Sequence, residues 1–286
     1  MGLTALEAFA AEVGPPSAGP VTCVGGRTQW TVGGAVDPAA REVRAPAGVV
    51  EFVPAEMIVR CGAGTTVAEL DAALAPAGQT VALPDRTGAT VGGVLAVGHS
   101  GLRVLGWGPV RDVLLEARFV SARGELVKAG GPVVKNVSGF DLCRLLVGSL
   151  GTLGFLGEVV LRCRPRPAVS RWFAGRVDDP FAVTSALYRP AAVLSDGSTT
   201  WVLLDGHGED VDAQRRDVLA PVGFGEVDGP PPLTPDVRVA VAPGRFADPT
   251  ARAGVDPAVA ELNRRVKANF DPTGRLNPGR EVWTAA

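Results

Sequence analysis

A glycine turn near the start of the chain has the residues to bind a phosphate group. It reads Val24-Gly25-Gly26-Arg27-Thr28 and follows a short apolar run. Glycine lets the backbone approach a ligand closely, and successive N–H groups in such a turn can cradle a pyrophosphate. The turn has neither the Gly-Lys-Ser/Thr of a P-loop nor the G-x-G-x-x-G of a Rossmann helix, so nucleotide hydrolysis and ordinary NAD binding lose support. Taken alone, it is also compatible with a plain chain reversal, the commoner meaning of Gly-Gly.

A second glycine-rich region covers residues 84–93, 98–101 and 107–112. So many glycines inside a domain indicate backbone that runs against something flat or bulky, although a set of ordinary loops would also account for them. The candidate ligand-binding residues of this region are Pro84, Thr90, Val91, Gly92, Gly93, His99, Ser100, Gly101, Arg111 and Asp112.

Two further segments end in exposed backbone. In the run 135–154, a polar lead-in and one or two apolar helical turns precede Gly148, Gly151 and Gly154, an arrangement that admits a large anionic cofactor. Near the C-terminus, Asn277-Pro278-Gly279-Arg280 forms a turn that either stops the chain or returns it to a ligand.

The chain has few residues for acid–base or metal chemistry. Of its two histidines, His207 lies in a polar loop and is expected to be solvated, whereas His99 lies in the glycine-rich region and is the one candidate for a catalytic base. The cysteines are far apart, without the C-x-x-C pairs of a zinc or iron–sulfur site, so no metal site is expected. Four thiols of this kind indicate a reducing compartment.

Composition limits the class of protein. With 286 residues, 46% hydrophobic and 20% charged, the chain can bury an ample core, and a net charge of -2 provides no general attraction to nucleic acid or to an anionic membrane. Residues 1–13 read as an amphipathic helix rather than a signal peptide, and the most apolar window, 142–161, contains charges and glycines. We therefore expect a cytoplasmic protein without a transmembrane segment.

Local patterns predict an α+β fold. A helix over residues 66–77 begins with a capping box of Thr66 and Glu69 and ends at Gly78. The expected strands of the first domain span 49–53, 57–61, 113–120, 126–129 and 155–164. Prolines bound a smaller α+β block, with strands near 169–177, 201–205 and 224–227 and a charged helix over 210–219, and a strand over 237–241 and a helix over 257–269 follow. The predicted domains are 1–168, a small α+β cap or substrate domain at 169–236, and a C-terminal segment, 237–286, that returns to the first domain.

These motifs together carry a family resemblance. The run 135–154 resembles the KN-x-x-GYDL … LxGSxGTLG signature of flavoproteins in the vanillyl-alcohol oxidase and p-cresol methylhydroxylase (PCMH-type) superfamily, and residues 277–280 resemble its NPG-K/R ending. Within that superfamily the chain is similar to FAD-binding subunits of bacterial glycolate oxidases. The likeness covers residues 20–168 and 237–280, and it implies a two-subdomain PCMH-type FAD-binding fold with a small inserted α+β cap domain.

The resemblance also implies which residues bind FAD. In such proteins the loop matching Val24 to Thr28 holds the pyrophosphate, the stretches matching 90–93 and 99–101 line the flavin, and those matching 151–154 and 158–159 reach the adenosine end. With the candidates named above, the expected cofactor-binding residues are Val24, Gly25, Gly26, Arg27, Thr28, Pro84, Thr90, Val91, Gly92, Gly93, His99, Ser100, Gly101, Arg111, Asp112, Gly151, Gly154, Glu158, Val159, Asn277 and Arg280.

Departures from the family pattern bear on activity. Arg27 stands where covalently flavinylated relatives have a histidine, so FAD is expected to be bound non-covalently, and Leu150 stands where catalytic relatives often have Glu. The histidine cluster of catalytic subunits is also missing. The implied function is therefore that of an FAD-dependent oxidoreductase subunit in a glycolate oxidase-like complex, which helps to oxidise a 2-hydroxy acid.

The implied partners are a homologous FAD-linked catalytic subunit and an iron–sulfur subunit that accepts the electrons, and peripheral membrane association through that complex is compatible with this function. Two alternatives stay open. One is a stand-alone FAD-dependent alcohol or 2-hydroxy-acid dehydrogenase, and the other is a flavin-free scaffold subunit.

Overall fold

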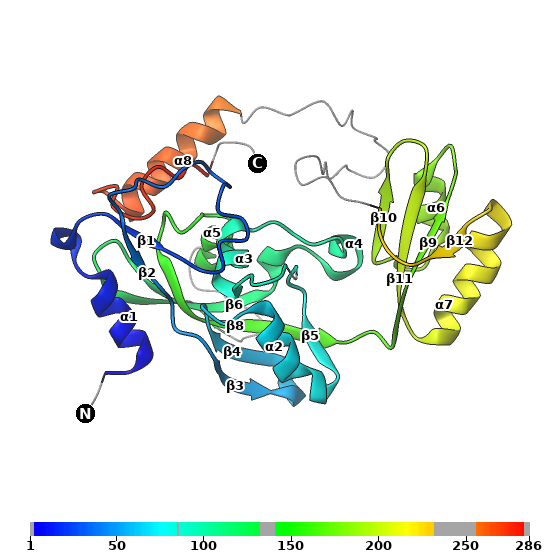
Figure 1. Cartoon of the computed structure of the whole chain (residues 1–286), viewed down its shortest axis with the longest axis horizontal. Helices are drawn as coiled ribbons and strands as arrows, with labels where there is room; N and C mark the ends of the chain where they lie inside the picture. The colour runs from blue at the N-terminus through cyan, green and yellow to red at the C-terminus, as the bar shows by residue number, and fades with distance from the viewer. Residues whose placement is uncertain (1–2, 85, 132–140, 232–255, 283–286) are drawn as a thin grey trace. The chain divides into compact units, whose positions relative to one another are not determined.

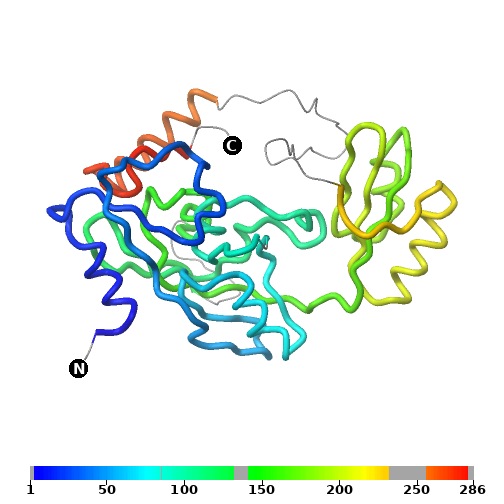
Figure 2. The backbone as a smooth tube through the Cα atoms, viewed as in Figure 1, coloured from blue at the N-terminus to red at the C-terminus, as the bar shows by residue number. Residues whose placement is uncertain are grey.

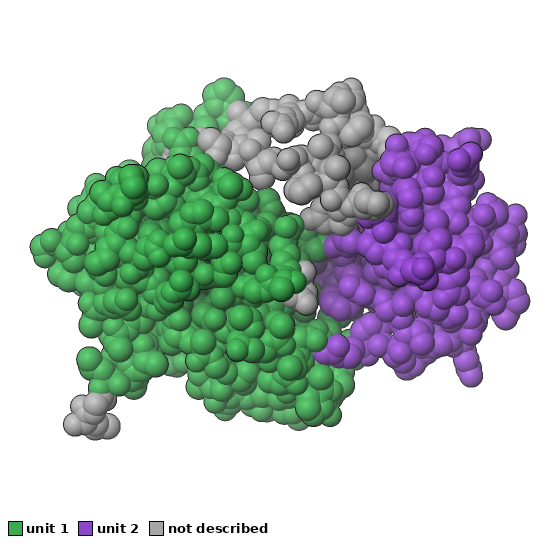
Figure 3. Space-filling view, in the orientation of Figure 1, with its two compact units in different colours: residues 1–101, 109–165, 254–286 green, residues 102–108, 166–253 purple. Residues whose placement is uncertain are grey.

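The chain divides into two compact units (Figure 3). The computed structural model describes residues 3–84, 86–131, 141–231 and 256–282. Unit 1 comprises residues 1–101, 109–165 and 254–286, and unit 2 comprises residues 102–108 and 166–253. Unit 2 thus takes in residues 102–108, which lie inside the predicted domain 1–168. The predicted strand 237–241 lies outside the described residues.

The main sheet of unit 1 is antiparallel, with strands in the order β3-β4-β8-β6-β7 and β5 paired with the end of β8 (Figure 1). The five strands predicted in this unit are confirmed to within one residue at each end. Strand β5 of this sheet was not predicted. The bounds are β3 Val49–Val53, β4 Ile58–Gly62, β5 Gln79–Val81, β6 Leu114–Val120, β7 Leu126–Gly130 and β8 Phe155–Pro165.

Short helices cover one face of this sheet and close its core. They are α2 (Val67–Leu74), α3 (Val91–Val97) and α5 (Leu142–Leu146). The capping box of Thr66 and Glu69 is present, Leu70 and Leu74 are fully buried, and a 3₁₀ turn over Ala75–Ala77 leads to Gly78 at φ 64°. The predicted helix 66–77 is therefore confirmed, with its last turn tightened. The core contains apolar side chains from the strands and helices: Val59, Cys61, Leu70, Leu74, Val91, Leu95, Ala117, Leu146, Val159 and Leu161.

The opposite face of the sheet carries charges, since neighbouring residues of a strand point to opposite faces. Glu116 is only 1% exposed and pairs with Arg60 at 3.1 Å and Lys128 at 3.2 Å. Glu158 pairs with Arg60 at 3.1 Å and with Arg118 at 3.2 Å. These five side chains form a connected ionic network on the sheet.

Segments near the two ends of the chain pack together in a second, smaller core of unit 1 (Figures 1 and 2). Strands β1 (Val21–Cys23) and β2 (Arg41–Val43) pair in parallel, and Leu276 forms a bridge to Val21. Helix α1 (Ala5–Val13) packs beside them, and α8 (Pro257–Phe270), predicted over 257–269, leads into the C-terminal turn. Arg275 is 3% exposed and donates to four main-chain carbonyls, those of Val13, Gly14, Gly19 and Ala122. The described part of the C-terminal segment, residues 256–282, is thus built into unit 1.

Unit 2 is an antiparallel sheet in the order β10-β11-β9-β12 with two helices on it. Its bounds are α4 Val104–Trp107, β9 Val169–Gly175, α6 Pro180–Ala186, β10 Ala192–Ser195, β11 Thr200–Gly206, α7 Gly208–Gln214 and β12 Gly225–Val227. The charged helix predicted over 210–219 starts two residues earlier and ends in a wider turn over Arg215–Leu219. Strand β10 was not predicted, because four residues after a proline carry little pattern. The α+β class is confirmed in both units.

No helix in the described ranges is both long and apolar enough to cross a bilayer.

Candidate functional site

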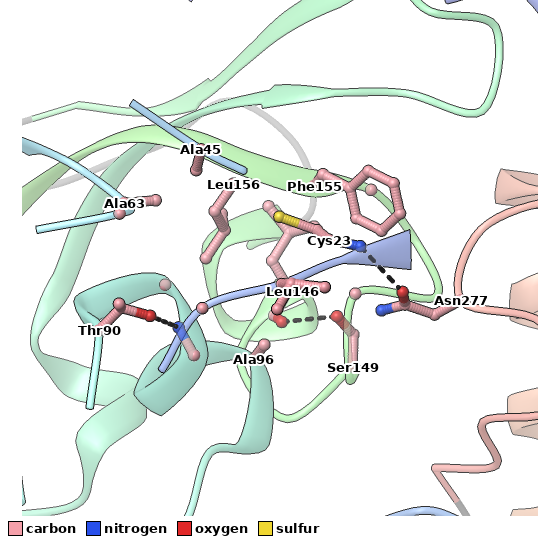
Figure 4. A pocket seen from close by; sticks show the side chains of 17 residues that line it. Cys23, Ala45, Ala63, Thr90, Ala96, Leu146, Ser149, Phe155, Leu156 and Asn277 are labelled. Atoms are coloured by element: carbon pink, nitrogen blue, oxygen red, sulfur yellow. Dashed lines mark hydrogen bonds between the residues drawn. The ribbon is translucent and has the colours of Figure 1, made fainter. Parts of the chain in front are cut away.

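Two adjoining cavities lie in unit 1, beside β1, α3 and the turn at residues 148–151. Figure 4 shows the first of them. They measure about 70 and 90 Å³. Both are lined by Cys23, Gly25, Thr90, Gly93, Ala96 and Asn277. The first is completed by Val24, Ala45, Ala63, Gly64, Gly92, Leu146, Ser149, Gly151, Gly154, Phe155 and Leu156, and the second by Thr22, Gly26, Arg27, Thr28, Gln29, Trp30, Val32, Val97, Leu150 and Arg280.

Helix α3 positions one side of both cavities. Thr90 caps the helix and accepts a hydrogen bond from the N–H of Gly93 at 3.2 Å. The last carbonyls of α3 accept hydrogen bonds from the turn that follows α5. The N–H of Gly148 donates to Leu95 at 2.9 Å, and that of Leu150 donates to Ala96 at 2.8 Å. The turn therefore lies against α3 through main-chain contacts.

The first cavity has small, mostly apolar walls. Alanine and glycine residues dominate its lining, and Leu146, Phe155 and Leu156 supply the larger apolar groups. A Cβ at Gly92 would lie 2.9 Å from Ala63, and one at Gly154 would lie 2.5 Å from the ring of Phe119. These glycines are thus required by packing between chain segments.

The backbone N–H groups of the loop at residues 24–28 differ in their hydrogen bonding. Val24 donates to the carbonyl of Val43 at 2.8 Å. Among the described residues, no acceptor is found for the N–H groups of the next four residues, Gly25 to Thr28. Consecutive N–H groups left open in this way suit an anion. The two glycines also allow close packing, because a Cβ at Gly25 would meet Thr90 and one at Gly26 would meet the carbonyl of Gly88.

Two arginines make the second cavity cationic. Arg27 is half-exposed, lies at φ 55° and pairs with Glu42. Arg280 is 7% exposed, and its Nη1 donates to the carbonyls of Val32 and Gly34. Burial lowers the pKa of Arg280 from its ordinary value. Both guanidinium groups lie over the Trp30 ring, at 5.0 Å for Arg27 and 4.7 Å for Arg280.

Asn277 joins three segments between the cavities. Its Oδ1 accepts from the hydroxyl of Thr22 at 2.6 Å and from the N–H of Cys23 at 3.2 Å. Its Nδ2 donates to the carbonyl of Leu150 at 2.5 Å. The C-terminal turn, β1 and the turn after α5 are thus connected by one buried side chain.

Most of the predicted site residues lie together at these cavities. The lining includes Val24, Gly25, Gly26, Arg27, Thr28, Thr90, Gly92, Gly93, Gly151, Gly154, Asn277 and Arg280. The run 135–154 reaches them through its described part, from residue 141 onward, and residues 135–140 lie outside the described ranges.

The other predicted residues do not line either cavity. Val91 and Val159 are buried in the main core, and Glu158 belongs to the ionic network on the opposite sheet face. Asp112 pairs with Arg144 at 3.0 Å and Arg111 is exposed. Pro84 packs against Gly101, and the hydroxyl of Ser100 accepts from the N–H of Val110 at 3.1 Å.

His99, the candidate base, contacts a residue that lines the second cavity. Its Nδ1 is 3.4 Å from the Nε2 of Gln29, which lines the second cavity. His99 itself does not line it.

Several lining residues were missed by sequence reasoning. Cys23, Trp30 and Ala96 have no motif of their own, and only their position beside a predicted glycine segment could have suggested them. Leu150 lies inside the run 135–154 but was not among the predicted cofactor-binding residues. No group of three or more His, Cys, Asp or Glu side chains within the described ranges is arranged to hold a metal ion.

Comparison with known proteins identifies a domain in the first half of the chain. Residues 16–130 match the family model described as an FAD binding domain. That range contains the 24–28 loop, Trp30, Thr90 and the whole of α3.

Three curated relatives show what the chain is similar to. Glycolate oxidase subunit GlcE of Escherichia coli (strain K12) is 38% identical over 154 residues, which are 53% of this chain and 44% of that protein. A D-lactate dehydrogenase of Archaeoglobus fulgidus is 39% identical over 37% of this chain and 24% of its own, and glycolate oxidase subunit GlcD of Bacillus subtilis (strain 168) is 39% identical over 29% and 17%. In each case the match spans less than half of the relative's length.

A solved structure of alkyldihydroxyacetonephosphate synthase has the same fold. It superimposes with a TM-score of 0.61 at 15% identity, over 77% of this chain and 51% of that one. The predicted PCMH-type FAD-binding fold is confirmed by this likeness together with the matched domain.

Proposed function

We propose that this chain, whose residues 16–130 form an FAD binding domain, is the FAD-binding subunit of a glycolate oxidase-like complex that oxidises a 2-hydroxy acid. The structural observation that carries the proposal is the 24–28 loop, with its open N–H groups beside two cavity-lining arginines. The substrate class rests on similarity to proteins named as glycolate oxidase subunits and as a D-lactate dehydrogenase.

The residues at the two cavities fit FAD. The N–H groups of residues 25–28, with Arg27 and Arg280, would hold the pyrophosphate by charge-assisted hydrogen bonds. The small-residue walls of the first cavity would take a flat aromatic part of the cofactor. Because Arg27 stands where a flavin-linking histidine would be expected, we propose that FAD is bound non-covalently.

Bound FAD would supply a hydride acceptor for the α-carbon of the hydroxy acid. The chain's own part is to bind and orient the cofactor, and its apolar cavity wall would exclude water from one side. His99 is our candidate for the group that takes the hydroxyl proton, since it contacts Gln29 at the rim of the second cavity.

The proposed partners are a homologous FAD-linked catalytic subunit and an iron–sulfur subunit that receives the electrons. Relatives that are themselves named as subunits support this assembly. Four free cysteines support a reducing, cytoplasmic location.

The test begins with the absorption spectrum of the purified chain, followed by titration with glycolate and D-lactate. We expect flavin bands that are released into the supernatant by acid, and bleaching by the substrate only after the two partner subunits are added. Bleaching of the chain alone would favour a stand-alone dehydrogenase. A chain that binds no flavin, with or without partners, would contradict the proposal and favour the scaffold.

A further inference from the structure

Trp30 is the residue on which two cations of the second cavity converge. The guanidinium carbons of Arg27 and Arg280 lie 5.0 and 4.7 Å from its ring centroid. Trp30 follows Arg27 in a tight turn, in which its N–H donates to the Arg27 carbonyl at 3.3 Å. Arg280 arrives from the other end of the sequence. All three side chains line the cavity.

Main-chain contacts fix the C-terminal turn beside this tryptophan. The N–H of Glu281 donates to the carbonyl of Gly33 at 2.8 Å, and that of Asp37 donates to the carbonyl of Pro278 at 2.9 Å. Arg280 is consequently held next to the loop that contains Trp30, and its position depends on residues far away in sequence.

The two cations need an electronegative environment. Both lie close to one ring, so they are nearer to each other than the Debye length of about 10 Å at 0.1 M salt and repel each other. Arg27 has Glu42 as a partner, whereas the Nη1 of Arg280 donates to carbonyls. The electron-rich face of Trp30 offsets part of the repulsion, and a bound dianion would offset the rest.

We propose that Trp30 is a positioning residue, which holds Arg27 and Arg280 together as a two-cation site for the pyrophosphate group of FAD. The inference rests on the proposed function and adds to it a residue that joins the N-terminal loop to the C-terminal turn. It requires that the loss of the tryptophan ring weakens binding of ligands that carry a pyrophosphate and spares ligands that lack one.

The experiment compares W30F, which keeps an aromatic face, with W30L, which does not. FAD and riboflavin are titrated separately into the full-length apoprotein at several KCl concentrations, and inorganic pyrophosphate is tested as a competitor of FAD. The matched controls are W107F and W107L, because Trp107 also has an arginine over its ring, Arg103 at 5.0 Å, but lines neither cavity.

We expect W30L to weaken FAD binding about tenfold, the size of a partly desolvated cation–π contact. In W30L, riboflavin binding should be unchanged, and FAD binding should depend less steeply on the KCl concentration. Pyrophosphate should compete less well with FAD for W30L than for the parent. W30F should bind FAD within about threefold of the parent, and the Trp107 variants should bind it like the parent.

Two results would overturn the proposal and leave the proposed function intact. One is unchanged FAD affinity and salt dependence in W30L, and the other is an equal loss of FAD and riboflavin binding in W30F and W30L, which would indicate a role in folding alone. Absence of FAD binding by the parent chain would instead contradict the proposed function itself.

Discussion

The side-chain amide of Asn277 donates to the main-chain carbonyl of Leu150 at 2.5 Å, and both residues lie in the left-handed backbone region, at φ 44° and φ 53°. Asparagine tolerates this region, whereas leucine pays about 1 kcal/mol or more for it. The Leu150 conformation is held from both sides, since its N–H also donates to Ala96. A strained turn at the cavity wall thus depends on a residue near the end of the chain.

Replacing Asn277 by Asp should destabilise unit 1 by about 1–3 kcal/mol. The substitution keeps an oxygen that can accept from Thr22, but it places a second oxygen opposite the Leu150 carbonyl, where the amide had donated. The loss is measured by urea unfolding of the apoprotein at pH 7.

Thr22→Val is the matched control for that measurement. It removes one donor to the same Asn277 oxygen at nearly constant volume and should cost about 1 kcal/mol. If Asn277→Asp were as stable as the parent, Asn277 would not be the link between the two turns.

Acid should weaken the ionic network of the main sheet. Burial raises the pKa of the Glu116 carboxyl, but hydrogen bonds and charge from Lys128 and Arg60 outweigh burial, so the net shift is downward from an ordinary value near 4.5. A carboxylate with a lowered pKa in the folded state stabilises that state above pH 4.5, and this contribution is lost as the pH falls through the folded-state pKa.

Glu116→Gln should therefore cost about 2 kcal/mol at pH 7, because it removes the buried carboxylate that pairs with Arg60 and Lys128. The gap between variant and parent should stay constant from pH 7 to 5 and narrow below pH 4.5. The control is Glu51→Gln, whose carboxylate is exposed and 3.8 Å from Arg60, and whose cost should stay below about 0.5 kcal/mol. A gap that did not change with pH would show that Glu116 acts through packing alone.

Local patterns were sufficient to predict most of the elements. The capping box at Thr66 and the alternating strands 113–120 and 155–164 depend on neighbours a few residues apart, which a sequence displays directly. The strand at β10 and the assignment of residues 102–108 to unit 2 depend on pairing with distant segments, so no local signal marked them.

The candidate site was predicted in part for the same reason. Glycines signalled the loop at 24–28, but the sequence could not show that Gly26 is small because Gly88 lies against it. Trp30 and Leu150 both contact the C-terminal turn, which is far from them in sequence. Glu158 and Val159 were both predicted as cofactor residues, and the structure places their side chains on opposite faces of the sheet, as expected for adjacent residues in a strand.

The thiol of Cys23 should react very slowly, although it lines both cavities. Burial raises its pKa to about 12, so at pH 8 only about one molecule in 10⁴ carries the reactive thiolate. We expect iodoacetamide to modify Cys23 very slowly in the native chain at pH 8. The rate of modification should rise about tenfold per pH unit up to pH 10, without a plateau. Peptide mass spectrometry measures the rate at each cysteine, and labelling in urea is the control. Modification of native Cys23 at the rate of a free cysteine would contradict this environment.

The loop at residues 24–28 should be coupled to the start of α3 through Gly25 and Thr90. A Cβ at Gly25 would lie 2.3 Å from the Thr90 hydroxyl oxygen but 3.4 Å from the Thr90 Cβ. Gly25→Ala should therefore displace the loop and lower FAD affinity, and removing the hydroxyl should make room for the new methyl group.

The double-mutant cycle of Gly25→Ala and Thr90→Ala tests this coupling. Thr90→Ala alone should cost about 1 kcal/mol of stability, because it removes the cap of α3. The double variant should lose about 1 kcal/mol less unfolding free energy than the sum of the losses of the two single variants. It should also bind FAD more tightly than Gly25→Ala does. Gly208→Ala is the control, since a Cβ there meets nothing within 4 Å. Strict additivity of the two costs would mean that the loop and α3 do not constrain each other, and that Gly25 is required for another reason.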